Sequence, residues 1–263
     1  MNYTEGNYWK MDRVRAFKSW KYGASIVGVF LIFVFCGSNM YYPKMGLVDI
    51  IDNIFWGRMV MLTIPMCALV YSDAICADCE KKFYRLFYTR GDKKRYLTSK
   101  IGTCFGAACG AMTIGFLLFC FVLSFKYPVM VSGGDYSYTY AQSYGYLLEI
   151  KQYFAYFFLV GFQYGLLAGI LATVGMTATI FLVNRLLAYA VPLFFYYFLI
   201  NLFSDVGSKR PYLQLHLIFK ACHSKPWEND IFCLGWAILV TILSLSFIGK
   251  IAKWGMNRRV MND

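Results

Sequence analysis

Few residues in this chain have the types and spacing that chemistry requires. The nearest to a ligand motif is Cys76-Ala77-Asp78-Cys79, a C-x-x-C pair of the kind that binds metals or forms redox disulfides. No second cysteine pair accompanies it, and the only histidines, His216 and His223, stand far along the chain. The nine cysteines lie mostly in apolar runs, where cysteine behaves as a small hydrophobic residue. We therefore expect neither a metal site nor a redox site.

The sequence also lacks an evident energy-coupling site. It contains no G-x-x-x-x-G-K-[ST] phosphate loop, so we do not expect the chain to bind ATP in that way by itself. The ionisable residues inside its long apolar runs are Arg58 and Asp73, near opposite ends of one run, whereas ion-coupled carriers usually place such a group deeper. A membrane enzyme would need paired carboxylates, histidine ligands or an activated nucleophile. We expect no catalytic residue and no cofactor in this chain, and a separate subunit as its energy source.

The elements that must position any site are long apolar runs. The chain has 263 residues, of which 59% are hydrophobic and 15% charged, a composition too apolar for one water-soluble core. Because a spanning helix needs roughly 20 apolar residues, we predict an all-α integral membrane protein with six transmembrane helices in a single domain, 1–263. The six predicted spans are 24–38, 54–76, 101–125, 153–183, 186–203 and 231–249.

The distribution of cations predicts the orientation in the cell membrane. Short cytoplasmic loops retain Lys and Arg, and 18 of the 26 cations would lie on one side of the six spans, with eight on the other. This bias places both termini in the cytoplasm. It also makes 77–100 a cytoplasmic loop, and 126–152 and 204–230 extracytoplasmic segments. The first outer segment has a hairpin signal at 129–140, and the second predicts a re-entrant or interfacial helix within 209–227, although both could be plain surface loops.

The N-terminal segment, 1–22, is expected to contain an interfacial helix on the cytoplasmic side. Val14, Phe17 and Trp20 recur every three residues and form an apolar side, while Arg15 and Lys18 lie on other sides. A disordered basic tail is the alternative.

The loop 77–100 has a pattern of its own. Phe83, Leu86 and Phe87 form one apolar stripe if Glu80 to Thr89 is helical, and Gly91-Asp92 would then break that helix. Such a loop could lie solvated on anionic lipid headgroups, or it could be a docking surface for a cytoplasmic partner.

The loop also contains, in order, Asp78 and Glu80, then Gly91, Arg95-Tyr96-Leu97 and Ser99-Lys100. These ordered features resemble those of the permease subunits of type-2 ABC exporters. In that family a basic amphipathic helix precedes six spans, and a coupling helix lies between the second and third. The resemblance implies a coupling helix that sits in a groove of an ABC ATP-binding subunit, in which ATP and Mg²⁺ would bind.

The resemblance also implies which residues contact that subunit. They belong to the coupling loop and to the turn between the fourth and fifth spans, a turn that could equally be a plain connection. The expected docking residues are Glu80, Lys81, Phe83, Tyr84, Arg85, Leu86, Phe87, Arg90 and Arg185.

The same resemblance implies further partners and a cargo. A second permease subunit would pair with this one as a homodimer or heterodimer, membrane lipids would surround it, and no nucleic acid is expected. The expected function is export of an amphipathic or hydrophobic cargo, such as a peptide, drug or lipid, by alternating access. The alternative is a non-transporting membrane sensor or immunity protein that recruits a cytoplasmic partner through the basic loop.

Two glycine series predict close helix packing. Glycines recur every four residues in the third and fourth spans, on one face of each helix, where backbones can approach closely. These faces could pack statically or slide during transport. The residues are Gly102, Gly106 and Gly110, and then Gly161, Gly165 and Gly169.

Overall fold

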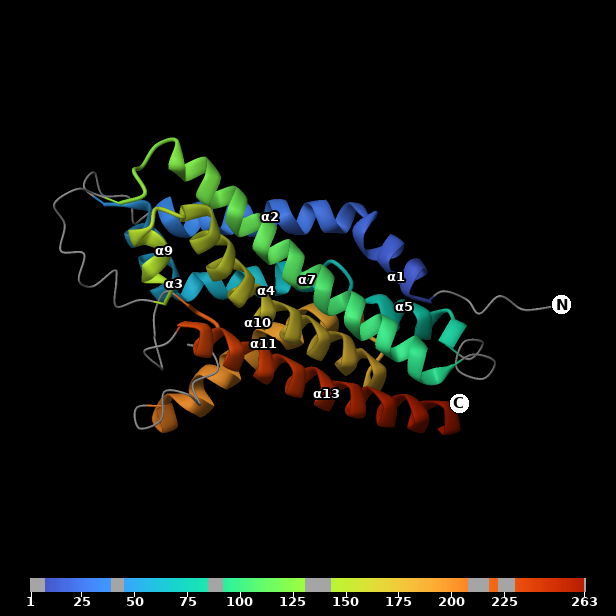
Figure 1. Cartoon of the computed structure of the whole chain (residues 1–263). Helices are drawn as coiled ribbons and strands as arrows, with labels where there is room; N and C mark the ends of the chain where they lie inside the picture. Colours follow the sequence, from blue (N-terminus) through green and yellow to red (C-terminus); the bar gives the residue numbers. More distant parts are fainter. Residues whose placement is uncertain are drawn as a thin grey trace.

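Four long apolar helices run along the molecule, and each is long enough to cross a membrane (Figure 1). They are α2 (Trp20–Ser38), α7 (Lys93–Ser124), α10 (Tyr153–Phe181) and α13 (Asp230–Asn262). Their high hydropathy makes them the natural spans of a bilayer. The chain therefore has the architecture of a multi-pass helical membrane protein, and each of the four helices contains most or all of one predicted span.

The computed structural model describes residues 8–38, 45–84, 92–130, 143–207, 218–221 and 230–262. Within these ranges every regular element is helical. The shorter helices are α1 (Tyr8–Phe17), α3 (Leu47–Trp56), α4 (Thr63–Ala68), α5 (Ala74–Glu80), α9 (Gly145–Glu149), α11 (Arg185–Gly207) and the 3₁₀ helix η1 (Arg58–Leu62). The all-α part of the predicted fold class is thus confirmed for the described residues, with four helices long enough to span a membrane. Most of the predicted outer hairpin lies outside the described residues.

The predicted span 54–76 is not one continuous helix. It runs through the end of α3, then η1, α4 and a turn into α5. Gly57 has extended backbone angles (φ −64°, ψ 141°) and ends α3, while Pro65 has no N–H to donate to the turn before it. The predicted span 186–203 lies within α11, which carries Pro192 and forms a shorter apolar stretch than the four long helices.

The centre of the bundle is the contact between α10 and α7. Of the four long helices α10 is the most buried. A Cβ placed on Gly165 would lie 2.9 Å from the carbonyl oxygen of Cys109, and one on Gly169 would lie 2.9 Å from that of Phe105. The two backbones therefore approach so closely that only glycine fits at these positions without a shift. Gly161, on the same face, lies against the Phe116 ring.

The glycines of α7 face other neighbours. Gly102 lies against the indole of Trp9 in α1. A Cβ placed on Gly110 would lie 3.0 Å from the Tyr22 hydroxyl in α2. A Cβ on Gly106 would meet no atom within 4 Å. The two series therefore serve different contacts and do not form one shared seam.

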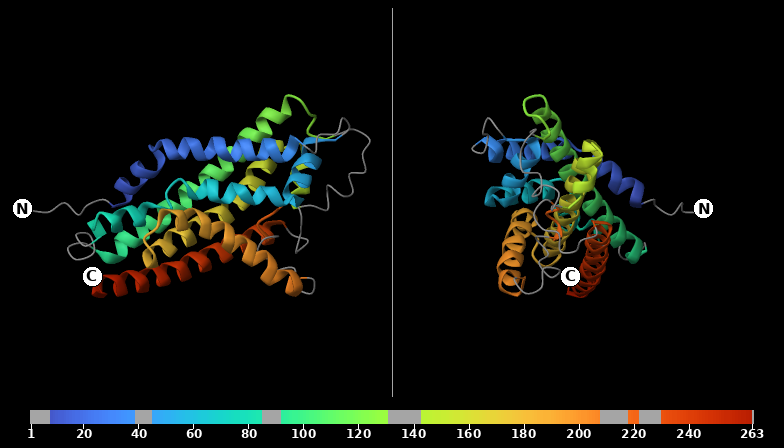
Figure 2. Two further views of the ribbon diagram at one scale, coloured as in Figure 1. Left: turned by 180° about the vertical axis from the view of Figure 1, so that it is seen from behind. Right: turned by 60° about the vertical axis from the view of Figure 1, so that its left-hand side comes forward.

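The bundle has two ends, each marked by different short helices, and Figures 1 and 2 show them from several sides. One end holds α1, α5 and the last turns of α13, and we call it the α1 end. The opposite end holds α3 and α9, and we call it the α3 end. The first described helix starts and the last one finishes at the α1 end, so the chain returns to the side on which it began.

Helix α1 turns its predicted apolar side outward. It buries Asp12 and Ala16 against the bundle, whereas Val14 and Phe17 are nearly half exposed and Trp20, at the start of α2, is 79% exposed. Exposed aromatic and aliphatic side chains beside cations are typical of a helix that lies in a membrane interface.

Candidate docking site and the ion-pair network beneath it

The two segments expected to contact a partner meet at the α1 end. Glu80, the last residue of α5, pairs with Arg185, the first residue of α11. The Arg185 Nε donates to Glu80 Oε1 at 3.1 Å, and a second guanidinium nitrogen donates to Oε2. Hydrogen bonding from Arg185 holds the pKa of the Glu80 carboxyl below its usual value. Residues 105 positions apart thus form one exposed, bidentate pair.

The expected helix over 80–89 starts later than the sequence predicts. Helix α5 ends at Glu80, and Lys82 has a left-handed backbone (φ 56°) that interrupts the helix before helical backbone resumes at Phe83 and Tyr84. Lys81 is exposed, and Phe83 is 46% exposed. The chain therefore turns between α5 and the described start of the next helix, and these two side chains lie at the surface.

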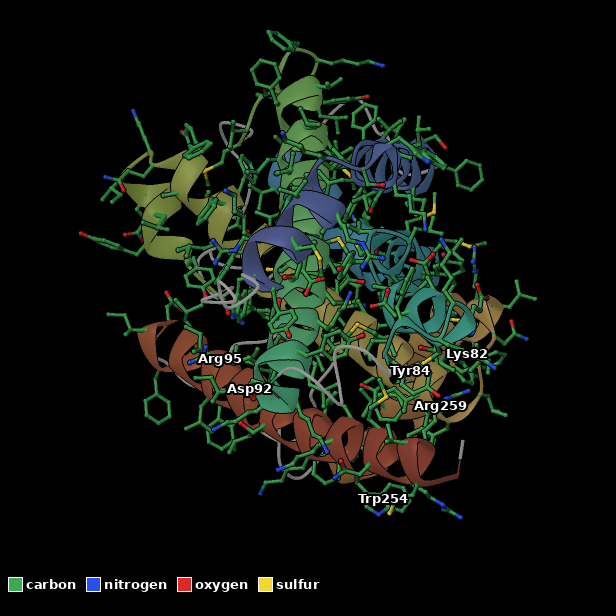
Figure 3. All side chains as sticks on the ribbon, turned by 90° about the vertical axis from the view of Figure 1, so that its right-hand side faces the viewer. Lys82, Tyr84, Asp92, Arg95, Trp254 and Arg259 are labelled. Atoms are coloured by element: carbon green, nitrogen blue, oxygen red, sulfur yellow. The ribbon has the colours of Figure 1, made fainter. Side chains whose placement is uncertain are left out.

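Tyr84 is buried, although it was expected to contact a partner. It is 1% exposed, and the guanidinium of Arg259 in α13 lies 6.0 Å from the centre of its ring (Figure 3). Arg259 also donates to the Ile180 carbonyl at the end of α10, at 2.7 Å. Tyr84 therefore anchors the loop to α10 and α13 and offers no free face to a partner.

The middle of the predicted docking loop lies outside the described residues. This part includes Arg85, Leu86, Phe87 and Arg90. The next described residue is Asp92, whose carboxylate caps α7 by accepting hydrogen bonds from the backbone N–H groups of Lys94 (2.9 Å) and Arg95 (3.2 Å) (Figure 3).

Beneath this surface lies a buried ion-pair network centred on Lys100. Its ammonium lies 3.0 Å from Asp12 Oδ1 and 2.9 Å from Asp78 Oδ2. The side chains of Lys100 and Asp12 are fully buried, and that of Asp78 is 6% exposed. Buried charges are stable only when their partners have good geometry and their remaining polar atoms are hydrogen-bonded.

Both carboxylates have these additional hydrogen bonds. Asp12 accepts from the hydroxyls of Tyr71 and Ser99, each at 2.6 Å. Asp78 accepts from the Tyr96 hydroxyl at 2.9 Å and from Arg15 at 3.3 Å. The network therefore joins two carboxylates, two cations and three hydroxyls, and its formal charges balance.

The network ties together the elements on both sides of the docking loop. Asp12 belongs to α1, Asp78 to α5 at the start of the loop 77–100, and Lys100 to α7 at its last residue. A further ion pair, Lys21 to Asp73 at 2.5 Å, joins α2 to the turn before α5. The loop is thus anchored at both ends to elements that include α1, α2 and α7.

Only part of this network is visible in the sequence. Tyr96, Ser99 and Lys100 follow the i, i+3, i+4 spacing of one helix face, which is a signal for a shared polar surface. Asp12, their main partner, lies in a distant basic segment, and nothing in the sequence pairs it with Lys100. Among the residues that the structure describes, no group of three or more His, Cys, Asp or Glu side chains could hold a metal ion. Cys76 Sγ instead lies 3.7 Å from Glu80 Oε1.

No protein-family model, curated protein or solved structure matches this chain. The function proposed below therefore rests on the residues of the chain and their geometry.

Proposed function

We propose that this chain is the transmembrane permease subunit of an ATP-driven ABC exporter of the type-2 class. The observation that carries the proposal is the Glu80–Arg185 pair, which brings the two segments expected to contact an ATP-binding subunit onto one surface. That surface stands on the Lys100 network, so a force applied to it reaches several helices.

The mechanism follows from this anchoring. ATP and Mg²⁺ bind the partner subunit, and closure of that partner moves the docking surface formed by Glu80, Lys81, Phe83 and Arg185. Because Asp78 and Lys100 join the two ends of the loop to α1, the displacement passes to α1, α5 and α7 as one unit. Because α7 packs closely against α10, this displacement also moves α10 at the centre of the bundle, and the resulting alternating access moves the cargo.

The proposed topology has six crossings, with both termini in the cytoplasm. Four crossings are the long helices, and the others are the broken segment from α3 to α5 and the helix α11. Three observations support a cytoplasmic α1 end: the excess of Lys and Arg there, the shared side of α1 and the last turns of α13, and the exposed indoles of Trp20, at the start of α2, and Trp254, in α13, which suit a membrane interface.

The proposed assembly contains a second permease subunit and two ATP-binding subunits. Apolar side chains are widely exposed along the long helices, as expected for surfaces that face lipid or another permease. The cargo is an amphipathic or hydrophobic molecule.

Affinity purification tests the proposal. The tagged chain is solubilised in mild detergent and its partners are identified by mass spectrometry. We expect an ATP-binding subunit to copurify, and the Arg185→Glu and Phe83→Ala variants to retain less of it. Lys151→Glu, which reverses an exposed cation far from the docking surface, is the matched control and should retain it fully. A partner without ATPase activity would instead favour the sensor or immunity function.

A further inference from the structure

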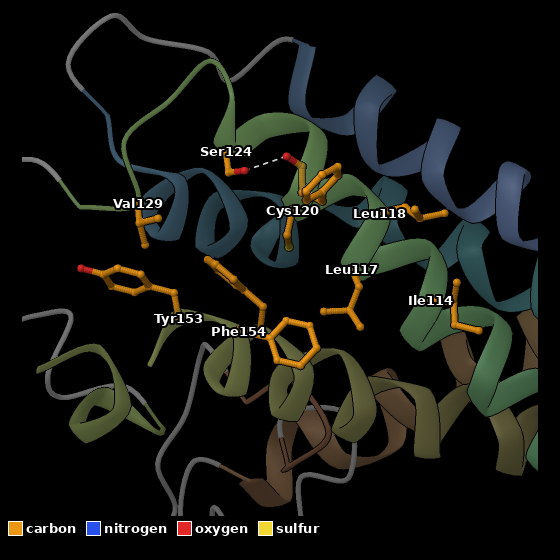
Figure 4. A pocket seen from close by; sticks show the side chains of 10 residues that line it. Ile114, Leu117, Leu118, Cys120, Ser124, Val129, Tyr153 and Phe154 are labelled. Carbon is orange, nitrogen blue, oxygen red and sulfur yellow. Dashed lines mark hydrogen bonds between the residues drawn. The ribbon is translucent and has the colours of Figure 1, made fainter. Parts of the chain in front are cut away.

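Two apolar cavities in the described part of the bundle differ in what adjoins them. The first, of about 490 Å³, lies between α7 and α10, beside Leu117, Tyr153 and Phe154 (Figure 4). The Ser124 hydroxyl in its lining bonds the Phe121 carbonyl of the same helix (Figure 4). The second, of about 600 Å³, lies between α10, α11 and α13. The described residues that line these cavities carry no charge, so both cavities suit hydrocarbon.

The second cavity, which we call the lateral cavity, has α10 as its floor. Helices α11 and α13 both pack on α10 but stand apart from each other, as the right-hand view of Figure 2 shows. The floor extends from Leu167 to Phe181, and α13 forms one wall from Val240 to Ile251. Phe181 and Phe247 are exposed, so the edge of the cavity lies at the surface of the bundle that faces lipid.

The length of the lateral cavity matches one leaflet of a membrane. At 1.5 Å per residue, the wall from Val240 to Ile251 is ~17 Å long and the floor from Leu167 to Phe181 is ~21 Å long. The hydrocarbon core of a bilayer is about 30 Å thick, so one leaflet contributes ~15 Å. Because Phe181 ends α10 at the α1 end, the cavity covers the hydrocarbon of the leaflet on that side.

A cation lies on the same face of α13, beyond the end of the lateral cavity. Residues of this face recur at alternating spacings of four and three, so they form one stripe along the helix. In order they are Val240, Ser244, Phe247, Ile251, Trp254 and Arg258, and the first four line the cavity. Arg258 lies ~10 Å beyond Ile251, toward the α1 end.

Two aromatic rings connect the lateral cavity to this cation. The ring of Phe181, which lines the cavity, lies 5.9 Å from the ring of Trp254, measured between centroids. The Arg258 guanidinium lies 5.7 Å from the centre of the Trp254 ring. Trp254 is exposed, and indoles of membrane proteins are enriched at the level of the lipid headgroups. The cation therefore has the depth of a headgroup, directly after a cavity that has the depth of an acyl chain.

The chemistry of the cation favours an anionic headgroup. A guanidinium stacked on an aromatic ring keeps N–H donors at its edge, and these donors suit the oxygens of phosphate. Residues 231–263 contain four cations and one carboxylate, Asp263, so this part of the chain carries net positive charge. A hydrocarbon cavity followed by a phosphate-binding cation is the arrangement that a phospholipid requires.

We propose that the lateral cavity binds one acyl chain of an anionic phospholipid from the leaflet at the α1 end, and that Arg258 binds the phosphate of its headgroup. Trp254 lies between the two parts of the lipid. This site goes beyond the proposed export function and does not depend on it, because a membrane protein of either proposed function could bind lipid here.

Native mass spectrometry of the purified chain tests the site without any ATPase. The chain is released from micelles that contain dioleoyl phosphatidylglycerol or dioleoyl phosphatidylcholine, which share their acyl chains and differ in net charge. One arginine near a membrane surface strengthens the binding of anionic lipid about fivefold, so we expect phosphatidylglycerol to bind at least about fivefold more tightly. Equal affinity of the two lipids would overturn the proposal.

Variants in α13 locate the preference. Arg258→Gln should remove most of it. Lys253→Gln removes the same charge from an exposed position about 140° away around the helix and should leave the preference unchanged. Equal losses in the two variants would show a general attraction of lipid to positive charge and would overturn the site. Both side chains are exposed, so neither replacement should disturb folding, and binding of phosphatidylcholine reports on that.

A photoreactive lipid tests the position of the acyl chain. Phosphatidylglycerol with a diazirine midway along one chain is incorporated with the protein into nanodiscs, and its adducts are mapped by peptide mass spectrometry. We expect the adducts to concentrate in 167–181 and 240–251. Ser244→Trp, which fills the lateral cavity, should remove them, whereas Ser124→Trp, the matched change in the first cavity, should retain them. Adducts spread evenly over the four long helices would overturn the proposal.

A second photoreactive group separates lipid from protein as the occupant. Phe247 is replaced with p-benzoylphenylalanine, and the chain is irradiated in the membranes of the cells that produce it. We expect adducts to lipid. A crosslink to a second copy of the chain or to another protein would give the cavity to that partner and overturn the proposal. Failure of an ATP-binding subunit to copurify would refute the export function but would leave these lipid results unaffected.

Discussion

Replacing Lys100 with methionine tests the proposed role of the buried network most severely. A methionine side chain would keep most of the volume but remove the ammonium from between Asp12 and Asp78, whose carboxylates lie 3.0 and 2.9 Å away. Removing one partner of a buried ion pair costs about 3–5 kcal/mol, because the other charge stays buried without compensation. We expect the lower end, ~3 kcal/mol, because the Tyr71 and Ser99 hydroxyls continue to bond Asp12 and Tyr96 and Arg15 continue to bond Asp78.

The measurement is the free energy of unfolding in mixed micelles, followed by circular dichroism as denaturing detergent is added. Lys94→Met is the matched control, because Lys94 is exposed on the same helix and its loss should change stability by less than ~0.5 kcal/mol. Adding Asp12→Asn to Lys100→Met removes one uncompensated charge and should recover part of the loss. If Lys100→Met costs no more than Lys94→Met, the network does not stabilise the α1 end and the reasoning is refuted.

Two further predictions concern the core and the docking surface. Gly169→Ala should destabilise the bundle by ~1–3 kcal/mol, because the added Cβ would lie 2.6 Å from the Phe105 ring and 2.9 Å from the Phe105 carbonyl oxygen. Gly106→Ala should be neutral or stabilising by up to ~1 kcal/mol, because a Cβ there would meet no atom within 4 Å. Thermal unfolding of the two variants checks this difference, and equal effects on stability would contradict the packing of α10 against α7. Because Arg185 lowers the pKa of Glu80, their pair contributes fully above the usual value of 4.5 and is lost as the pH falls through the lowered pKa. Amide hydrogen exchange of residues 74–84, corrected for intrinsic rates, should therefore accelerate in that acidic range. In the Glu80→Gln variant the same segment should exchange rapidly even at pH 7. If exchange in the wild type depends on pH as little as it does in Glu80→Gln, the pair does not hold this segment.

The parts of the fold that the sequence predicted are those set by local composition. Four of the predicted spans lie in long apolar helices, because twenty consecutive apolar residues have few alternatives in a membrane. The prediction of a single helix over 54–76 was wrong because hydropathy averages over Gly57, whose extended backbone ends α3 without making the run polar. Gly57 was visible in the sequence, but the apolar average outweighed it. The second interruption, at 69–73 between α4 and α5, contains no Gly or Pro to indicate it.

The site depended more on contacts between distant segments. The sequence placed Glu80 and Arg185 on the same side of the membrane, but only the fold shows that they touch. It counted Lys100 among the cations of the cytoplasmic loop and as part of the Ser99-Lys100 feature, whereas the fold encloses it between Asp12 and Asp78. It treated Tyr84 as a docking residue, whereas the fold buries it beside Arg259. In each case the missing information is a partner far along the chain, which no local pattern contains.

The most direct test of the proposed function is ATP hydrolysis by the copurified ATP-binding subunit in sealed vesicles, measured with and without this chain. The proposal predicts that the chain stimulates hydrolysis, that Arg185→Glu removes most of the stimulation, and that Lys151→Glu retains it. A subunit that hydrolyses ATP at the same rate whether or not the chain is present would contradict the claim that this membrane protein is driven through its α1 end.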